Sequence, residues 1–335
     1  MKISVLGAGA FGSAFASRLA MNKRLDVTLF ARDQAVVDEV NKKNSNKKYL
    51  SNLVLSKKLH ASANLSELAE SDIVFLSIPS SQMQPFFSDS ENLALVSSCS
   101  HVCNLSKGFI GNDGHVLITD FLQSILPEDV VLSSAKGPTF SNELLTSPHS
   151  AFSIAATDGK GVKSLGSVLK KAKLVFDVNH SLAEIELLSV LKNIYAIAIA
   201  VVDGRFKNPN LTSLVFSNAL LEMQRLSMLL LGRDINVSCY AGVGDLLLTS
   251  MNDQSRNRTL GLMLGKRFLS PNNQLSGVVL EGVRSINYID LLLNSKTDES
   301  EVAKKRMAKD FKILFSLSAF LKSELDLDKF VRKIV

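Results

Sequence analysis

The chain opens with Lys2–Ala20, KISVLGAGAFGSAFASRLA, in which an apolar run, three glycines and an amphipathic segment follow one another directly. This order is typical of a β-strand, a tight turn and an α-helix. Gly7, Gly9 and Gly12 have the G-x-G-x-x-G spacing. The first glycine permits the turn, the second leaves room for a pyrophosphate, and the third lets the helix approach the strand. A tight turn by itself also favours glycine, but the position between strand and helix predicts dinucleotide binding.

Composition narrows the class of protein. With 335 residues and 46% hydrophobic content, the chain is expected to be globular with about two domains. The net charge is +6, but no Lys/Arg-rich run is interleaved with aromatic residues, so no nucleic-acid partner is expected. Cys99, Cys103 and Cys239 form neither an even disulfide framework nor a metal-ligand spacing, which predicts a reducing compartment and no metal site.

The sequence gives no sign of membrane insertion. The chain enters a predicted strand at once, so no secretory signal peptide is expected. The longest apolar stretch, Leu187–Val202, is interrupted by Lys192 and Asn193 and is short for a bilayer span. We interpret it as a buried core helix, without stable membrane insertion.

The first half of the chain alternates short apolar runs with amphipathic segments. Residues 44–63 are polar and lysine-rich and are predicted to be loop with short irregular strands. The alternation predicts an α/β fold in which residues 1–180 form a Rossmann-like, doubly wound, dinucleotide-binding domain. The further predicted strands cover residues 26–30, 72–78, 101–105, 130–134, 151–155 and 174–178.

The second half has a different pattern. From Ser181 onward apolar residues recur with a 3.6-residue period and strand alternation is missing. Residues 181–335 are therefore predicted to form an all-helical substrate or catalytic domain. The helical segments cover residues 182–202, 211–231, 262–268, 278–294 and 309–324.

Lys192 lies in a segment whose apolar residues cover most of the helix circumference. A lysine there must reach solvent through its long side chain or find polar partners, because an unpaired buried ammonium is costly. Desolvation favours the neutral amine, which allows proton transfer near neutral pH. Asn193 and Asp245 are candidate partners, although Asp245, beside two glycines, is equally suited to cap a helix.

Cationic residues follow several predicted strands, at the sheet edge where α/β folds bind ligands. Arg32 follows the second strand, where an arginine accommodates the 2′-phosphate of NADP; an exposed loop arginine explains it equally well. Lys107, beside Gly108, is open to two interpretations as well: it is an exposed surface lysine, or it contacts a phosphate or carbonyl group of a ligand.

Ser255-Arg256-Asn257-Arg258 supplies a dense set of donors before a helix predicted over residues 259–267. Such a set suits a phosphate, and a basic solvent-facing turn is the alternative. Combined with the glycine loop and Lys192, it predicts hydride transfer to a small phosphorylated substrate.

Seven segments in order resemble one known family. LGAGAFGSAFA, LSKGF, KGPTFSNEL, VLKNIYAIAIAVVDG, YAGVGDLLLT, SRNR and VVLEGV, between Leu6 and Val283, are similar to bacterial-type NAD(P)-dependent sn-glycerol-3-phosphate dehydrogenases. The resemblance implies interconversion of dihydroxyacetone phosphate and sn-glycerol 3-phosphate for phospholipid synthesis in the cytoplasm. It leaves open a homodimer and the choice of NAD or NADP, with Arg32 favouring NADPH.

The resemblance also implies roles for individual residues. Lys192 would donate and accept the proton and contact substrate. Further substrate contacts would come from Lys107, Gly137, Thr139, Asp245, Ser255, Arg256 and Asn257. Beside Gly7, Gly9 and Gly12, cofactor contacts would come from Ala10, Phe11, Arg32, Lys107, Ser141, Arg256, Val279 and Glu281.

The chain departs from the family pattern at four positions. Leu188 and Ser189 stand where a pair of glycines is usual, Asn218 where an arginine is common, and Lys136 where a small residue is usual. None of these is a named substrate contact.

Two other functions are consistent with parts of the sequence. A ketopantoate or hydroxy-acid-type reductase shares the N-terminal pattern and a lysine on a helical domain, but does not need the phosphate-suited segment at residues 255–258. A non-catalytic dinucleotide-binding regulator would bind cofactor without turnover.

Overall fold

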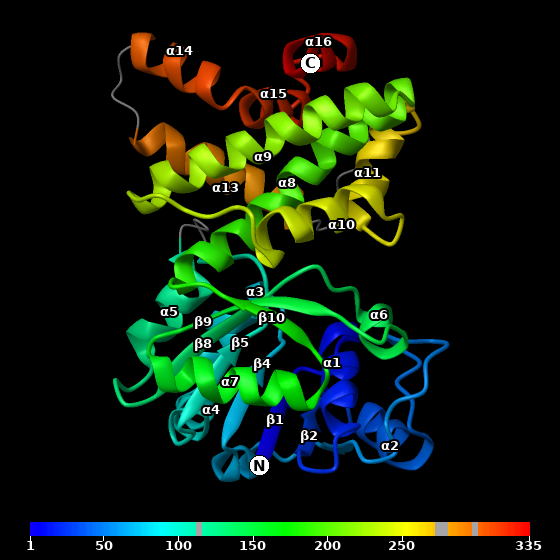
Figure 1. The fold of residues 1–335 in the computed structure, drawn as a ribbon, viewed down its shortest axis with the longest axis vertical. Coiled ribbons are helices and arrows are strands. Elements are labelled where there is room, and N and C mark those ends of the chain that lie inside the picture. Colours follow the sequence, from blue (N-terminus) through cyan, green and yellow to red (C-terminus); the bar gives the residue numbers. More distant parts are fainter. Residues whose placement is uncertain (112–115, 272–280, 297–300) are drawn as a thin grey trace. The chain divides into compact units, whose positions relative to one another are not determined.

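The computed structural model describes residues 1–111, 116–271, 281–296 and 301–335 (Figure 1). Residue contacts divide the chain into two compact units. The first comprises Met1–Gly111 with Val116–Glu186, and the second comprises Leu187–Val335. The division falls inside helix α8 (Leu182–Phe206), a few residues beyond the end of the strand region.

The first unit is built on an eight-stranded sheet with the order β10-β9-β8-β5-β4-β1-β2-β3. Neighbouring strands are parallel except β8 and β9, which are antiparallel. The mostly parallel sheet with its helices confirms the predicted α/β class. The strands are β1 (Lys2–Leu6), β2 (Asp26–Phe30), β3 (His60–Ser62), β4 (Ile73–Leu76), β5 (His101–Asn104), β8 (Val131–Lys136), β9 (Ala151–Ala156) and β10 (Val175–Val178), with a separate hairpin of β6 (Phe109–Ile110) and β7 (Val116–Leu117).

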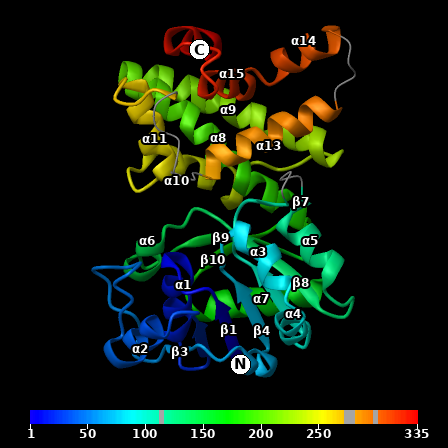
Figure 2. The same cartoon turned by 180° about the vertical axis from the view of Figure 1, so that it is seen from behind.

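Helices lie on both faces of this sheet (Figures 1 and 2). Phe15 of α1 packs edge-on against Phe75 of β4 and Phe152 of β9, with ring centroids 5.0 and 6.0 Å apart. Each such pair adds about 0.5–1.5 kcal/mol beyond the burial of its area, so α1 is firmly fixed to the sheet. The helices of this unit are α1 (Ala10–Ala20), α2 (Gln34–Lys43), η1 (Leu65–Glu70), α3 (Ser80–Phe87), α4 (Ser90–Ser97), α5 (Ile118–Ile125), α6 (Ser141–Thr146) and α7 (Gly159–Lys171).

In the described part of the second unit, the regular elements are all helices. Two of its helices, α8 and α9, are long and apolar enough to cross a bilayer by length and composition. The apolar window of α8 is entirely buried inside the protein, as expected of a core helix, whereas one third of the α9 window is buried. Besides α8, the elements are α9 (Pro209–Leu231), the π-helical turn η2 (Tyr240–Gly244), α10 (Asp245–Met251), α11 (Arg256–Gly265), α13 (Glu281–Lys296), α14 (Glu301–Asp310), α15 (Lys312–Leu321) and α16 (Leu327–Ile334).

Several predicted helix boundaries differ from the observed ones. The helix predicted to start at residue 259 or 262 starts at Arg256, because Ser255 caps it. The segment predicted over residues 309–324 is divided at Phe311, whose backbone is not helical, between α14 and α15. The first residues of the segment predicted over 278–294 lie outside the described residues.

Candidate active site

The three glycines of the turn between β1 and α1 have different surroundings, which indicate different roles. Gly7 has φ +114°, and a Cβ there would lie 2.5 Å from the Ser77 carbonyl oxygen. A Cβ on Gly12 would lie 2.0 Å from the Gly7 oxygen. A Cβ on Gly9 would meet no atom within 4 Å. Packing therefore requires the outer two glycines, and the middle one borders open space that suits a pyrophosphate.

The N-terminus of α1 borders the same space. Gly9 is the N-cap residue, and the first turn contains Ala10 and Phe11 but no acidic side chain. The backbone N–H groups of this turn and the positive end of the helix dipole favour an anion. The residues present thus fit a dinucleotide.

The loop after β2 presents positive charge. Arg32 is exposed. The carboxylate of Asp33 caps α2 by accepting from the Ala35 N–H at 3.0 Å, and it also pairs with the Lys48 ammonium at 3.1 Å. Both interactions keep the pKa of Asp33 below its ordinary value, the hydrogen bond from Lys48 first. Asp33, the residue that follows Arg32 in the sequence, is thus already paired with Lys48 and with the N-terminus of α2.

Two loops at the carboxyl ends of β5 and β8 meet. The Lys107 ammonium donates to the Gly137 carbonyl at 3.4 Å, and the Thr139 N–H donates to the same oxygen at 2.9 Å. Ser141 begins α6 directly after this loop. The structure therefore brings together Lys107, Gly137 and Thr139, three of the predicted substrate contacts.

Lys136, where the family usually has a small residue, is fully buried. Its ammonium lies 3.1 Å from Glu186 Oε1 and donates to the carbonyls of Asn104 at 3.1 Å and Ser106 at 2.6 Å. Burial lowers the pKa of Lys136, and the charge of Glu186 opposes that shift. The buried Lys136 ammonium thus has three polar partners.

In the second unit, the Lys192 side chain is 8% exposed and points to α10 rather than to solvent. Its ammonium donates to Asp245 Oδ1 at 3.0 Å and to Thr249 Oγ1 at 2.7 Å. The alternative of a solvent-reaching lysine is therefore wrong. Asp245 is not the N-cap of α10 either, because Gly244 occupies that position.

Thr249 was not predicted from the sequence. It lies four residues after Asp245, one turn further along α10, so both side chains share a helix face. That spacing is the signal that could have identified it.

Asn193 joins three helices of the second unit. Its Oδ1 accepts from the Asn257 amide of α11 at 2.9 Å, and its Nδ2 donates to Glu281 of α13 at 3.5 Å. Among the described residues, the buried Oδ1 atom of Asn257 has no hydrogen-bond partner. Val279, the remaining predicted cofactor contact of this region, lies outside the described residues.

The residues at the start of α11 have unequal roles. The Ser255 hydroxyl caps the helix by accepting from the Arg258 N–H at 3.2 Å. The Arg258 guanidinium donates to the Ser250 carbonyl at 2.6 Å and to Asp203 at 2.8 Å, which fixes α11 to α10 and α8. Arg256, in contrast, is exposed at the helix N-terminus. Arg258 thus acts as an anchor, and Arg256 is available to an anion.

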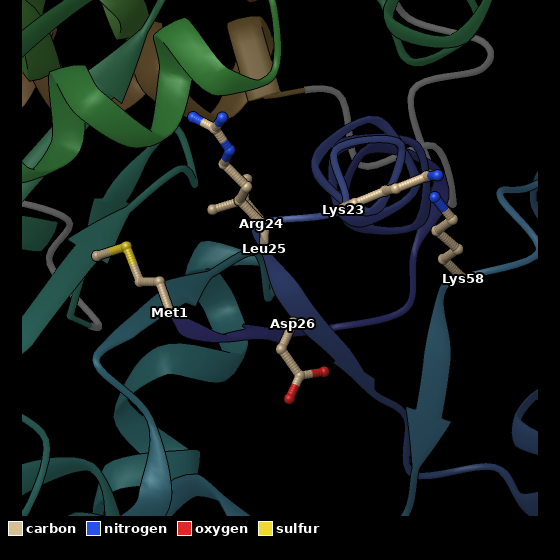
Figure 3. A pocket seen from close by; sticks show the side chains of 6 residues that line it. All are labelled: Met1, Lys23, Arg24, Leu25, Asp26 and Lys58. Atoms are coloured by element: carbon tan, nitrogen blue, oxygen red, sulfur yellow. The ribbon is translucent and has the colours of Figure 1, made fainter.

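A surface hollow of about 510 Å³ lies elsewhere (Figure 3). Its lining residues precede or begin β1 and β2 or, for Lys58, precede β3, so it lies at the opposite strand ends from the glycine turn. No predicted site residue contributes to it. The lining residues are Met1, Lys23, Arg24, Leu25, Asp26 and Lys58. Within residues 1–111, 116–271, 281–296 and 301–335, no cluster of three His, Cys, Asp or Glu side chains could hold a metal ion.

Comparisons with known proteins identify the family of the chain. Residues 2–162 match the family described as NAD-dependent glycerol-3-phosphate dehydrogenase N-terminus, and residues 182–332 match the corresponding C-terminus. A glycerol-3-phosphate dehydrogenase [NAD(P)+] of Methanothermobacter thermautotrophicus is 31% identical over 290 residues, 86% of this chain and 87% of that protein. One from Burkholderia lata is 29% identical over 308 residues, 90% and 91% of the two chains.

Solved structures show the same similarity. The glycerol-3-phosphate dehydrogenase of Coxiella burnetii has 25% sequence identity and a TM-score of 0.82, covering 99% of this chain and 98% of that one. Because the family models together match residues 2–162 and 182–332, the chain belongs to the NAD-dependent glycerol-3-phosphate dehydrogenases and is an NAD(P)-dependent oxidoreductase.

Proposed function

We propose that the protein interconverts dihydroxyacetone phosphate and sn-glycerol 3-phosphate, with Lys192 as the catalytic acid and base. The supporting observation is the Lys192 ammonium, which is buried in an apolar helix and bonded to Asp245 and Thr249. The product would supply the glycerol backbone for phospholipid synthesis in the cytoplasm.

Reduction of the ketone requires a proton donor for its oxygen atom, and Lys192 can be that donor. Reduction of a ketone adds a hydride to carbon and a proton to oxygen, and a bound nicotinamide supplies the hydride. The Lys192 ammonium can protonate the oxygen as negative charge develops, which avoids a free alkoxide. Asp245 stabilises the charged form and, with Thr249, directs the Nζ atom. In oxidation the neutral amine accepts the proton.

The phosphate of the substrate needs separate donors. Arg256 is exposed at the N-terminus of α11, an arrangement suited to a dianion. Arg258 keeps that helix in place through Asp203 and Ser250. A reductase for an unphosphorylated acid does not need this cluster.

The test compares parent protein, Lys192→Ala and Thr249→Val with dihydroxyacetone phosphate and either reduced cofactor. Because positioned acid–base groups contribute about 10²–10⁴-fold, Lys192→Ala should lower kcat by about a thousandfold and leave cofactor affinity unchanged. Thr249→Val, which keeps Lys192 and Asp245, should have a smaller effect.

Parent-level turnover by Lys192→Ala would contradict the assignment. Turnover of ketopantoate without turnover of dihydroxyacetone phosphate would favour the reductase alternative. Cofactor binding without turnover of either ketone would favour the regulator.

We also propose that NADPH is preferred to NADH. The support is exposed Arg32, together with the engagement of Asp33 by Lys48 and the α2 N-terminus. Arg32→Ala should raise KM for NADPH by about tenfold, the loss of one charge-assisted interaction of about 1.4 kcal/mol, and leave KM for NADH unchanged. Arg24→Ala, an exposed arginine at the opposite strand ends, is the matched control. An equal effect of Arg32→Ala on both cofactors would reject the preference.

A further inference from the structure

Lys136 and Glu186 form an ion pair whose side chains are 0% and 3% exposed. Both groups have their other bonding positions filled. Glu186 accepts from the Ser134 hydroxyl at 2.9 Å, from the Thr119 N–H at 3.1 Å and from the Asn104 amide. A buried charge is tolerated when it is paired and hydrogen-bonded in this way.

The stability of the fold does not by itself require such a pair. Removing two charges from water costs several kcal/mol per ion, and replacing a buried pair by apolar side chains is often neutral or stabilising. The pair instead fixes the position of a loop, because both carbonyls that Lys136 contacts, of Asn104 and Ser106, belong to the short segment that begins with the last residue of β5.

This segment, Asn104–Gly108, is fixed from several sides. The Asn104 side chain accepts from the Ser106 N–H at 2.9 Å and donates to the Ser106 carbonyl at 3.2 Å. The Ser106 hydroxyl donates to the Ile78 carbonyl at 2.5 Å. Lys107 is the next residue, and its ammonium donates to Gly137, the neighbour of Lys136. The bonds of Lys136 therefore join the segment that carries Lys107 to the end of β8.

We propose that Lys136 and Glu186 are positioning residues that hold the Asn104–Gly108 segment, and with it the Lys107 ammonium, where a phosphorylated substrate is bound. Lys136 supplies the two bonds to the segment, and Glu186 keeps Lys136 charged and directed toward them. The inference rests on the proposed function for the role of Lys107.

The central variant is Lys136→Met/Glu186→Gln. It removes both charges and both bonds to the segment, while the amide introduced in place of the Glu186 carboxylate retains an acceptor for Ser134 and Asn104. Since no charge is left unpaired, the variant should fold, and Tm should fall only modestly, because the Thr119 N–H and the Asn104 and Ser106 carbonyls lose a partner. KM for dihydroxyacetone phosphate should rise about tenfold with kcat nearly unchanged, as expected when ground-state and transition-state binding are lost equally. Lys160→Met, at an exposed lysine of α7, is the control.

Coupling to Lys107 separates positioning from general destabilisation. In a Lys107→Met background the double change should have no further effect on KM, because the residue that it positions is already absent. A merely structural role would lower Tm but leave KM unchanged in either background.

Hydrogen exchange of the parent protein tests the same point without a variant. The Leu105 and Ser106 amides, which donate to Leu76 and Asn104, should exchange as slowly as those of β5, and faster in the double variant. Loop-like exchange in the parent, or a folded double variant with parent KM, would overturn the proposal. If the parent failed to reduce dihydroxyacetone phosphate, the proposed function would fail, and these exchange rates would still decide whether the pair holds the segment.

Discussion

At the scale of single residues, the three glycines after β1 differ in what an added methyl group would meet. At Gly12 it would collide with the Gly7 oxygen, whereas at Gly9 it would enter open space. Gly9 also has φ −70° and ψ −178°, a conformation open to any residue. Glycine at this position is thus dispensable for the fold and needed only where a ligand approaches.

Gly9→Ala should therefore separate binding from folding. We expect Tm to be unchanged or slightly raised, since replacing a compatible glycine stabilises by about 0.4–1 kcal/mol. Cofactor affinity should fall by about tenfold or more, because the methyl group would occupy the place of the pyrophosphate. Fluorescence titration with NADPH and thermal denaturation would measure both. Gly12→Ala is the contrasting variant and should fail to fold stably; full cofactor affinity in Gly9→Ala would contradict the site.

The sequence identified Lys192 and its partner Asp245, because an ammonium in an apolar helix must be compensated. It could not choose between a solvent-reaching and an internal lysine. That choice depends on α10, which places Asp245 and Thr249 beside a residue more than fifty positions earlier in the chain. Lys136 illustrates the same limit, since its partner Glu186 comes from another element and only the fold brings them together.

At the scale of elements, Glu222 of α9 caps a different helix. Its carboxylate accepts from the Ile313 N–H at 2.9 Å and the Leu314 N–H at 2.8 Å, at the start of α15. Tyr195 of α8 donates to it at 3.3 Å, and the charge of Arg225 also acts on it. Burial nevertheless raises the pKa of Glu222 to about 7.

This pKa predicts how stability depends on pH. The folded protein binds the Glu222 proton more tightly than the unfolded chain, where the ordinary pKa is 4.5. The resulting stabilisation is complete below pH 4.5 and is lost as the pH rises through 7, about 3 kcal/mol in all. Urea denaturation at pH 5 and pH 8 should show Glu222→Gln gaining about this much relative to the parent at the higher pH. Glu91→Gln, at an exposed residue of α4, should show no such gain, and a pH-independent difference for Glu222→Gln would contradict the prediction.

The positions of helices and strands could be predicted from the sequence where the apolar residues recur with a clear period. The apolar runs located the strands of the main sheet apart from β3, which lies in the segment expected to be loop with short strands. An apolar run has no direction, so the antiparallel pairing of β9 with β8 could not be inferred. The start of α11 was missed because Ser255 is both a donor for a ligand and a helix cap, and only the structure shows the second use.

At the scale of the whole molecule, α9 presents an apolar surface. Leu214, Leu221 and Leu229 are 43%, 55% and 42% exposed. Leu214 and Leu221 lie seven residues apart, so they share one side of the helix. Exposed leucines on one helix face could meet the same face of a second chain in a two-fold contact.

We therefore expect a homodimer that uses α9. Sedimentation equilibrium should give twice the 36.5 kDa mass of the chain, and Leu221→Lys should shift the equilibrium toward the monomer, because a buried unpaired ammonium opposes association. Leu247→Lys, at an exposed leucine of α10, is the control. A monomeric parent at all concentrations, or a dimer indifferent to Leu221→Lys, would exclude this contact.

The burial of α8 has a consequence for synthesis in the cell. Ile197 and Val201 of α8 lie against Gly261 and Gly265 of α11, which are encoded much later. At roughly 5–20 residues per second, translation leaves the emerging α8 without this cover for several seconds. During that interval an apolar segment as long and hydrophobic as a membrane span is accessible to ribosome-bound chaperones, targeting factors and neighbouring nascent chains. The yield of folded protein in the cell should therefore depend on which of them binds the segment first.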